Sequence, residues 1–227
     1  MTTTTQGRDR HTSVFAEGIV QVDAARIRYL EAGQGAAVVV LREDTSLTPS
    51  LFDTLLAQTF RVIVVGMPRT DETASRAAAR TLTHLVAALA VEHYMLVSTA
   101  AHAHSALWQV LETPEQFNGL VLLSPPALHT EGRTNTGSDT HDAALESRLP
   151  EIQAPTLVVF GTNAQSLPAD AGQRYVERLT SCYYTLLYDA GQDIATDRPH
   201  ALFAAVRDFV ERRGAFIVEQ ASTALNP

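Results

Sequence analysis

The chain has 227 residues, 45% of them hydrophobic, which suits a single domain with a substantial core. Its formal net charge of -8 at pH 7 argues against nucleic acid as a partner, because phosphate binding requires a basic surface. A single cysteine, Cys182, excludes an intramolecular disulfide and fits the reducing cytoplasm, where we expect the protein to reside. No apolar stretch approaches the ~18 residues of a membrane span, so we expect no membrane association.

Both ends of the chain are expected to be flexible, over residues 1–12 and 219–227, and residues 13–218 are expected to form one domain. The first ten residues hold no apolar run, so they resemble neither a signal peptide nor a membrane anchor.

After a hairpin predicted at residues 19–22 and 26–30, short apolar runs alternate with helical patterns. Runs rich in Val, Leu and Ile are what parallel strands buried on both faces require. They occupy residues 37–41, 61–65, 94–98, 120–124, 156–160 and 184–188. Apolar side chains share a helical face at Leu82, Leu85, Val86 and Leu89, and again at Leu202, Val206, Phe209 and Val210. The alternation predicts an α/β fold, with a mostly parallel central sheet and helices on both faces.

Two prolines and one polar segment complete the predicted organisation. Pro49 and Pro168 are expected in the first turns of two further helices. Residues 125–150 are rich in Gly, Thr, Ser and Asp, so they predict a mobile surface loop with at most a short helix over 141–148.

The segment 94–103 runs from an apolar strand directly into a helix start made of small residues, and a second apolar strand follows Pro114. This arrangement resembles the strand, nucleophile elbow and helix of the α/β-hydrolase family, whose elbow usually reads Gly-x-Ser-x-Gly. Further stretches similar to the family are residues 29–35, 60–63, 114–125, 154–161 and 190–199. The resemblance spans roughly residues 18–213 and implies the α/β-hydrolase fold, with 125–150 in the place of the helical cap that family members commonly carry.

The resemblance also implies where a catalytic triad would stand. The family's serine nucleophile corresponds to Ala100, its acid to Ala164 and its histidine to Gln192. None of these side chains can attack a carbonyl group or carry a proton near neutral pH. The family's oxyanion-hole segment reads Arg42-Glu43, and the glycines flanking the nucleophile read Ser98 and His102. A strained elbow needs small neighbours, so His102 indicates that the turn has relaxed or that the imidazole fills space beside it.

Eight polar residues are candidates for a pocket at the carboxyl ends of the strands, where open α/β sheets bind ligands. They are Arg42, Glu43, Ser98, Thr99, His102, Asn163, Gln192 and Asp193. His102 is either a base or ligand contact, or a space-filling residue at a helix start. Arg42 and Glu43, with Asp44, pair with one another, contact a partner or belong to a solvated loop. Ser98 and Thr99 lack an evident base that would activate them as nucleophiles.

Asn163, Gln192 and Asp193 are expected to converge at the pocket mouth, although Asp193 also suits a helix N-cap. His102 and His104 are two residues apart and so point in nearly opposite directions on a helix, which argues against a metal site. We expect neither a metal nor a cofactor.

A hydrolase scaffold without its triad implies a pseudoenzyme that acts by binding. The vacated active site would hold a small apolar ligand or a protein partner, and a homo-oligomer would also cover it. The alternative is an enzyme of a non-hydrolytic class, a lyase, isomerase or cyclase, that uses the same pocket with His102 as its base. A hydrolase with a rewired hydroxyl is a third reading.

Overall fold

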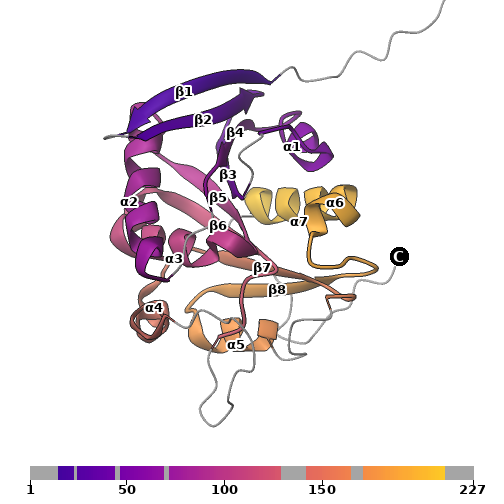
Figure 1. Ribbon diagram of the computed structural model, residues 1–227. Helices are drawn as coiled ribbons and strands as arrows, with labels where there is room; N and C mark the ends of the chain where they lie inside the picture. The colour runs from indigo at the N-terminus through magenta and orange to yellow at the C-terminus, as the bar shows by residue number, and fades with distance from the viewer. Residues whose placement is uncertain are drawn as a thin grey trace, which may run out of the picture.

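One eight-stranded sheet organises the part of the chain that the computed structural model describes, namely residues 15–22, 25–43, 47–68, 72–128, 142–164 and 171–212. Its order is β1-β2-β4-β3-β5-β6-β7-β8 (Figure 1). The strands are β1 (Ala16–Val22), β2 (Ala25–Ala32), β3 (Ala37–Arg42), β4 (Arg61–Gly66), β5 (Tyr94–Thr99), β6 (Phe117–Leu123), β7 (Thr156–Gly161) and β8 (Cys182–Leu187). The β1–β2 hairpin joins β4 in antiparallel fashion through β2, and every other neighbouring pair is parallel.

Helices cover both faces of this sheet (Figure 1). On one face lie α2 (Glu72–Ala88), α3 (Ala103–Glu112), α4 (Ala143–Arg148) and α5 (Ala171–Arg178). On the other lie α1 (Leu51–Leu56), α6 (Ile194–Asp197) and α7 (Pro199–Arg212). Short 3-10 turns occur at η1 (Ala100–His102), η2 (Pro114–Gln116) and η3 (Leu149–Glu151).

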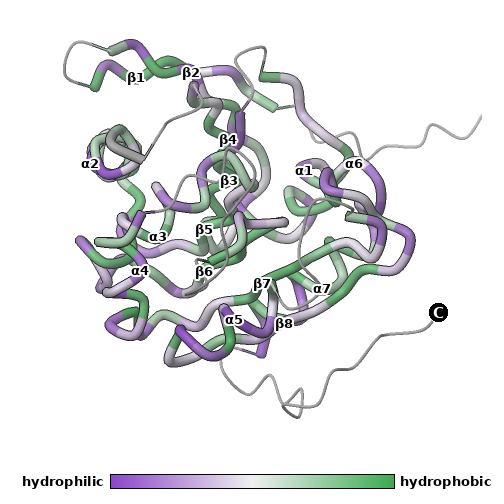
Figure 2. Tube along the Cα trace, turned by 60° about the horizontal axis from the view of Figure 1, so that its bottom comes forward, coloured by the Kyte–Doolittle hydropathy of each residue, from purple (hydrophilic) through white to green (hydrophobic). Residues whose placement is uncertain are grey.

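The two faces of the sheet contribute to two separate cores. In β3, Val39 and Leu41 pack toward α2 and α3, whereas Val38 and Val40 pack toward α1 and α7. Successive strand residues point to opposite faces, so a strand covered on both sides must be apolar throughout. Figure 2 shows this pattern as hydrophobic colour along the inner strands. The predicted α/β class, with its mostly parallel sheet between helices, is confirmed.

The boundaries of some elements differ from the predictions. Strand β8 covers Cys182–Leu187 rather than 184–188, and β6 begins at Phe117. The expectation that Pro49 lies in the first turn of a helix is wrong, because α1 begins at Leu51 with Ser50 as its N-cap. A capping box sets this start: the Ser50 side chain accepts from the Asp53 backbone, and the Asp53 side chain accepts from the Ser50 backbone.

Several predictions concern residues outside the described ranges. These are Pro168, residues 129–141 of the loop predicted over 125–150, residues 23–24 of the hairpin turn, and the flexible ends predicted over 1–12 and 219–227. Within the described ranges, no helix is long and apolar enough to cross a membrane.

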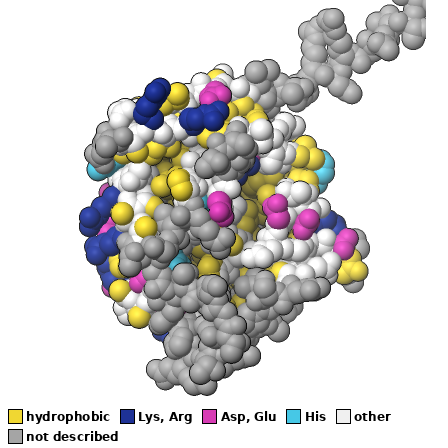
Figure 3. Space-filling view, in the orientation of Figure 1, with side chains coloured by type: hydrophobic (Ala, Val, Ile, Leu, Met, Phe, Trp, Pro, Cys, Tyr) yellow, Lys and Arg dark blue, Asp and Glu magenta, His cyan; other side chains and the backbone are white. Residues whose placement is uncertain are grey.

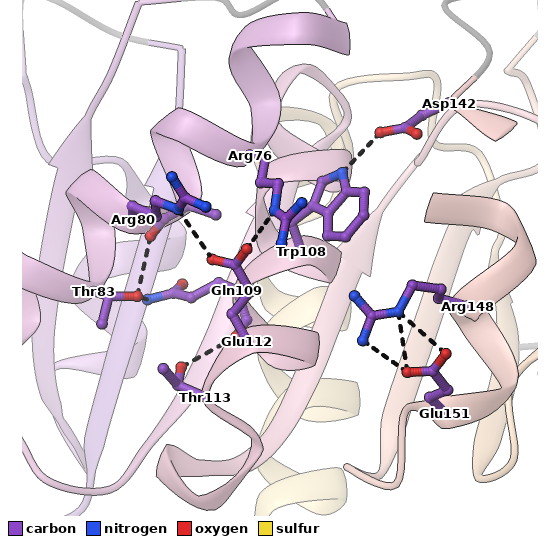
Figure 4. Close-up of polar contacts among 11 residues, drawn as sticks. Arg76, Arg80, Thr83, Trp108, Gln109, Glu112, Thr113, Asp142, Arg148 and Glu151 are labelled. Carbon is purple, nitrogen blue, oxygen red and sulfur yellow. Dashed lines mark hydrogen bonds and ion pairs between the residues drawn. The ribbon is translucent and has the colours of Figure 1, made fainter. Parts of the chain in front are cut away.

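The short helix predicted over 141–148 is α4, which docks on α3 through polar contacts to Trp108 (Figure 4). The Trp108 indole donates to Asp142 at 2.7 Å, and the Arg148 guanidinium lies 5.7 Å from the indole ring centroid. Arg76 of α2 lies over the same ring at 4.9 Å and pairs with Glu112. The contacts of Trp108 therefore join α2, α3 and α4 on one face of the sheet.

Candidate functional site

A cavity of about 660 Å³ lies at the carboxyl ends of β3, β5 and β6. This is the edge where open α/β sheets place ligands. Two further segments line it: residues 48–50, which lead into α1, and residues 192–196, at the start of α6. The lining residues are Arg42, Glu43, Thr48, Pro49, Ser50, Thr99, Ala100, Ala101, Leu123, Gln192, Asp193, Ile194, Ala195 and Thr196.

The turn that follows β5 brings Ala100 and Ala101 into the lining. Thr99 is extended, with φ of -76° and ψ of 167°, and the chain then enters η1 before α3 begins. Ala100 is not among the described residues with positive φ. The sharp, strained turn of a nucleophile elbow is therefore replaced by a relaxed 3-10 turn. A relaxed turn is one of the two possibilities that His102 indicated in the sequence.

The other outcome also holds, because the His102 imidazole fills space below this turn. Its side chain is buried, with 1% of the residue exposed, and Nε2 lies 3.1 Å from the carbonyl oxygen of Met67. A carbonyl oxygen only accepts hydrogen bonds, so Nε2 carries the proton in this contact. His102 does not line the cavity, and neither does Ser98, whose buried hydroxyl donates to the Thr99 carbonyl oxygen at 3.2 Å.

Arg42 lines the cavity from the end of β3 and is held by a carboxylate behind it. Its Nη1 donates to Asp53 Oδ2 at 2.8 Å, and its Nη2 donates to the carbonyl oxygen of Thr48. The Arg42 side chain is 15% exposed and the Asp53 side chain 1%. The same Asp53 oxygen accepts from the Ser50 backbone at 2.7 Å. Arg42 is thus part of a largely buried ion pair, and the solvated-loop interpretation of this residue does not hold.

Gln192 and Asp193 also line the cavity, on the loop that leads into α6. Asp193 is the N-cap of α6 and accepts from the Thr196 backbone, which agrees with the capping role considered for it. The approach of this loop depends on Gly161, because a Cβ there would lie 2.2 Å from the Ala190 carbonyl oxygen. A glycine at the end of β7 therefore lets the loop pack close to the sheet.

Asn163 does not join Gln192 and Asp193 at the cavity. Its amide donates to Asp189 Oδ1 at 3.1 Å on the exposed turn after β7. Ala164 lies beside it and is also outside the lining. Of the three positions predicted from the resemblance to correspond to a triad, Ala100 and Gln192 line the cavity and Ala164 does not.

Sequence reasoning missed the wall formed by the approach to α1, and it missed Asp53. The pattern Ser50-x-x-Asp53 just before an apolar helical stretch is a capping-box signal, so it could have located this helix start. That Asp53 also pairs with Arg42 has no local signal, because the contact depends on how the intervening loop returns to the sheet.

The polar side chains of the described lining are hydroxyls, carboxylates, one guanidinium and one amide. No histidine, cysteine or lysine belongs to the described lining. A serine or threonine hydroxyl is a weak nucleophile without a base, and the Ser50 hydroxyl already accepts from the Asp53 backbone at 3.1 Å. Among the described residues no group of His, Cys, Asp and Glu could hold a metal ion.

No family model and no curated protein matches the sequence. Solved structures do match it. A membrane phospholipase A, described as a bacterial virulence factor, is similar with a TM-score of 0.73 and 16% identity, over 88% of this chain and 86% of that chain. The 2-hydroxy-6-oxo-6-phenylhexa-2,4-dienoate hydrolase from Rhodococcus sp. strain RHA1 is similar with a TM-score of 0.72 and 14% identity, over 88% of this chain and 100% of that chain.

A serine hydrolase involved in carbazole degradation gives a TM-score of 0.71 and 18% identity, over 87% of this chain and 99% of that chain. Identities this low establish the architecture and leave the chemistry open. Together with the strand order and the helices on both faces, these likenesses show that the chain has the α/β-hydrolase fold.

Proposed function

We propose that this chain is a non-hydrolytic α/β-hydrolase homologue that binds a small molecule in the cavity at the carboxyl ends of its strands. The observation that carries the proposal is Ala100: a methyl group occupies the position beyond β5 where the fold's nucleophile would stand, and it lines the cavity. Gln192 lies in the same lining, where the fold's histidine would stand. The cavity therefore lies where an α/β-hydrolase has its active site, but these two positions supply neither a nucleophilic hydroxyl nor an imidazole base.

The lining supports binding as the remaining activity. Ala100, Leu123 and Ile194 provide apolar contacts, and Thr99 and Gln192 provide hydrogen-bonding groups beside them. A cavity of about 660 Å³ lies in the range typical of small-molecule sites, which combine apolar walls with a few polar groups.

The non-hydrolytic enzyme with His102 as its base receives no support from this geometry. A base must reach the proton that it abstracts, and His102 is buried beneath the turn with its Nε2 directed at Met67. A protein partner is the second candidate occupant. Leu51, next to the lining residue Ser50, is 52% exposed, which is the kind of apolar rim that a partner or a second copy would cover.

Three measurements on the purified chain test the proposal. A fluorophosphonate probe should not label it, and p-nitrophenyl esters should not be turned over above the buffer rate, while an active serine esterase in parallel reactions gives both signals. Ligand-observed NMR with small neutral and charged organic molecules should detect binding, which Ala100→Trp should abolish by filling the cavity. Fluorophosphonate labelling of a serine or threonine that lines the cavity would overturn the proposal. So would ligand binding that Ala100→Trp leaves unchanged.

A further inference from the structure

Strand β6 is buried at every residue except Asn118, which is exposed and is followed by a glycine. Of the four asparagines in the chain, only Asn118 precedes a glycine. We propose that the pair Asn118 and Gly119 is a site of spontaneous covalent modification in the folded protein. The asparagine loses ammonia through a cyclic imide and becomes aspartate or isoaspartate. This inference is independent of the function proposed above.

A β-bulge places Asn118 outside the regular ladder of the sheet. Tyr94 and Met95 are consecutive in β5, and their partners in β6 are Phe117 and Gly119. Asn118 is therefore the extra residue of the bulge, and the pairing of β6 with β7 starts only beyond it. A regular ladder holds an asparagine in extended backbone, which keeps its side chain away from the next amide nitrogen. The bulge relieves Asn118 of this restraint, although β6 lies between β5 and β7 in the interior of the sheet (Figure 1).

Packing explains why a glycine follows Asn118. A Cβ atom at position 119 would lie 2.9 Å from Met95 Cε and 3.1 Å from the carbonyl oxygen of Pro155, so a larger residue would displace its neighbours. The missing side chain also leaves the Gly119 amide nitrogen unshielded. The bulge thus requires the residue that makes the preceding asparagine most open to attack.

The reaction needs only the chain and water. The Gly119 nitrogen attacks the side-chain carbonyl carbon of Asn118 and forms a bond to it. The bond from that carbon to the side-chain NH2 group breaks, and the NH2 group leaves as ammonia with the proton that the Gly119 nitrogen loses. Water then opens the ring: its hydroxyl adds to a ring carbonyl carbon, and its proton goes to the nitrogen that is released. Opening at the side-chain carbonyl gives aspartate, and opening at the main-chain carbonyl gives isoaspartate.

Either product adds a carboxylate to a chain whose formal net charge is already -8. On the face seen in Figure 3, acidic side chains lie near α6, whereas most of the basic side chains lie over α2 and the β1–β2 hairpin. A further negative charge strengthens retention on an anion exchanger, so the modified chain separates from the unmodified one.

The test follows two asparagines in one sample. The full chain is incubated in mildly alkaline buffer and mapped by mass spectrometry of its peptides. Asn163 is the internal comparison: it is also exposed, but it precedes Ala164 and its amide donates to Asp189 Oδ1 at 3.1 Å. Asn118 should become a mixture of aspartate and isoaspartate, with a new late peak in anion exchange, while Asn163 should remain unmodified.

Asn118→Gln is the matched variant, because it keeps an exposed amide but would have to close a larger ring, which forms more slowly. The late peak should be lost in this variant, and circular dichroism verifies that it is folded. A late peak that persists in Asn118→Gln, or equal conversion of Asn163, would overturn the assignment to Asn118.

A parallel incubation in urea separates the contribution of the fold from that of the sequence. Asn118 should be converted in the folded chain as well as in the unfolded one, because the bulge leaves it outside the ladder. If Asn118 is converted in urea but remains intact in the folded chain over the same period, the bulge does not open this site and the proposal is wrong.

Discussion

The indole Nε1 of Trp108 donates a hydrogen bond to Asp142 Oδ2 at 2.7 Å, while Asp142 Oδ1 accepts from the backbone of Leu145 at 2.9 Å. One carboxylate therefore caps α4 and also fastens that helix to α3 (Figure 4). The contact positions α4, which is followed in the chain by η3 and then by strand β7.

Trp108→Phe should lower the free energy of unfolding by about 2 kcal/mol, because it keeps an aromatic ring but removes a hydrogen bond to a charged acceptor. Urea unfolding followed by circular dichroism measures the change. Asp142→Asn is the comparison variant: asparagine has one acceptor oxygen where aspartate has two, so it can keep the cap on Leu145 only by turning its NH2 group toward the indole N–H, and the loss should be at least as large as in Trp108→Phe. A Trp108→Phe protein as stable as the unaltered chain would contradict this role.

Asp53→Ala should cost about 3 kcal/mol of unfolding free energy, because it leaves the Arg42 guanidinium mostly buried without its carboxylate. The matched exposed pair is Arg28–Glu17, whose side chains are 45% and 49% exposed. Glu17→Ala should change stability by no more than about 0.5 kcal/mol, since solvent screens that pair. Thermal and urea unfolding of both variants check the contrast, and equal losses would mean that the Arg42–Asp53 pair adds nothing special.

Placing a serine and a histidine at two of the positions predicted to correspond to a hydrolase triad, Ala100→Ser with Gln192→His, should not produce a hydrolase. The backbone at Ala100 lies in a relaxed 3-10 turn, and the position that would supply the acid, Ala164, does not line the cavity. A serine without a positioned base and acid remains unreactive. Hydrolysis of p-nitrophenyl acetate by the double variant should equal that of a Thr99→Ser control. A burst of p-nitrophenol that only the double variant gives would contradict this prediction, because it would show that the serine and histidine side chains suffice for hydrolysis at this site.

Burial raises the pKa of the Cys182 thiol from an ordinary 9.0 to about 12. The thiolate is the reactive form, so iodoacetamide at mildly alkaline pH should alkylate the folded chain far more slowly than the chain in urea. The folded-state pKa lies above the unfolded one, so this group's contribution to stability is complete below about pH 9 and is lost as the pH rises toward 12. Mass spectrometry of alkylated protein measures the rates, and equal rates in both states would contradict burial of the thiol.

The sequence by itself determined the architecture. Runs such as Val38–Val40 in β3 are apolar at every position, and only strands covered on both faces require that pattern. It also determined that Ala100 and Gln192 carry no triad chemistry, because the identity of a side chain fixes what it can donate or abstract. For the polar segment 125–150 it allowed at most a short helix over 141–148, and α4 lies within that range.

Only the tertiary structure decided which polar groups meet. His102 is polar in sequence, yet a 3-10 turn directs it beneath the sheet edge toward Met67 rather than into the cavity. Asn163 turns to Asp189, while Arg42 finds Asp53 across a returning loop. Such pairings depend on loop paths and buried charge compensation, which bring together residues distant in the chain and leave no periodic trace in the sequence.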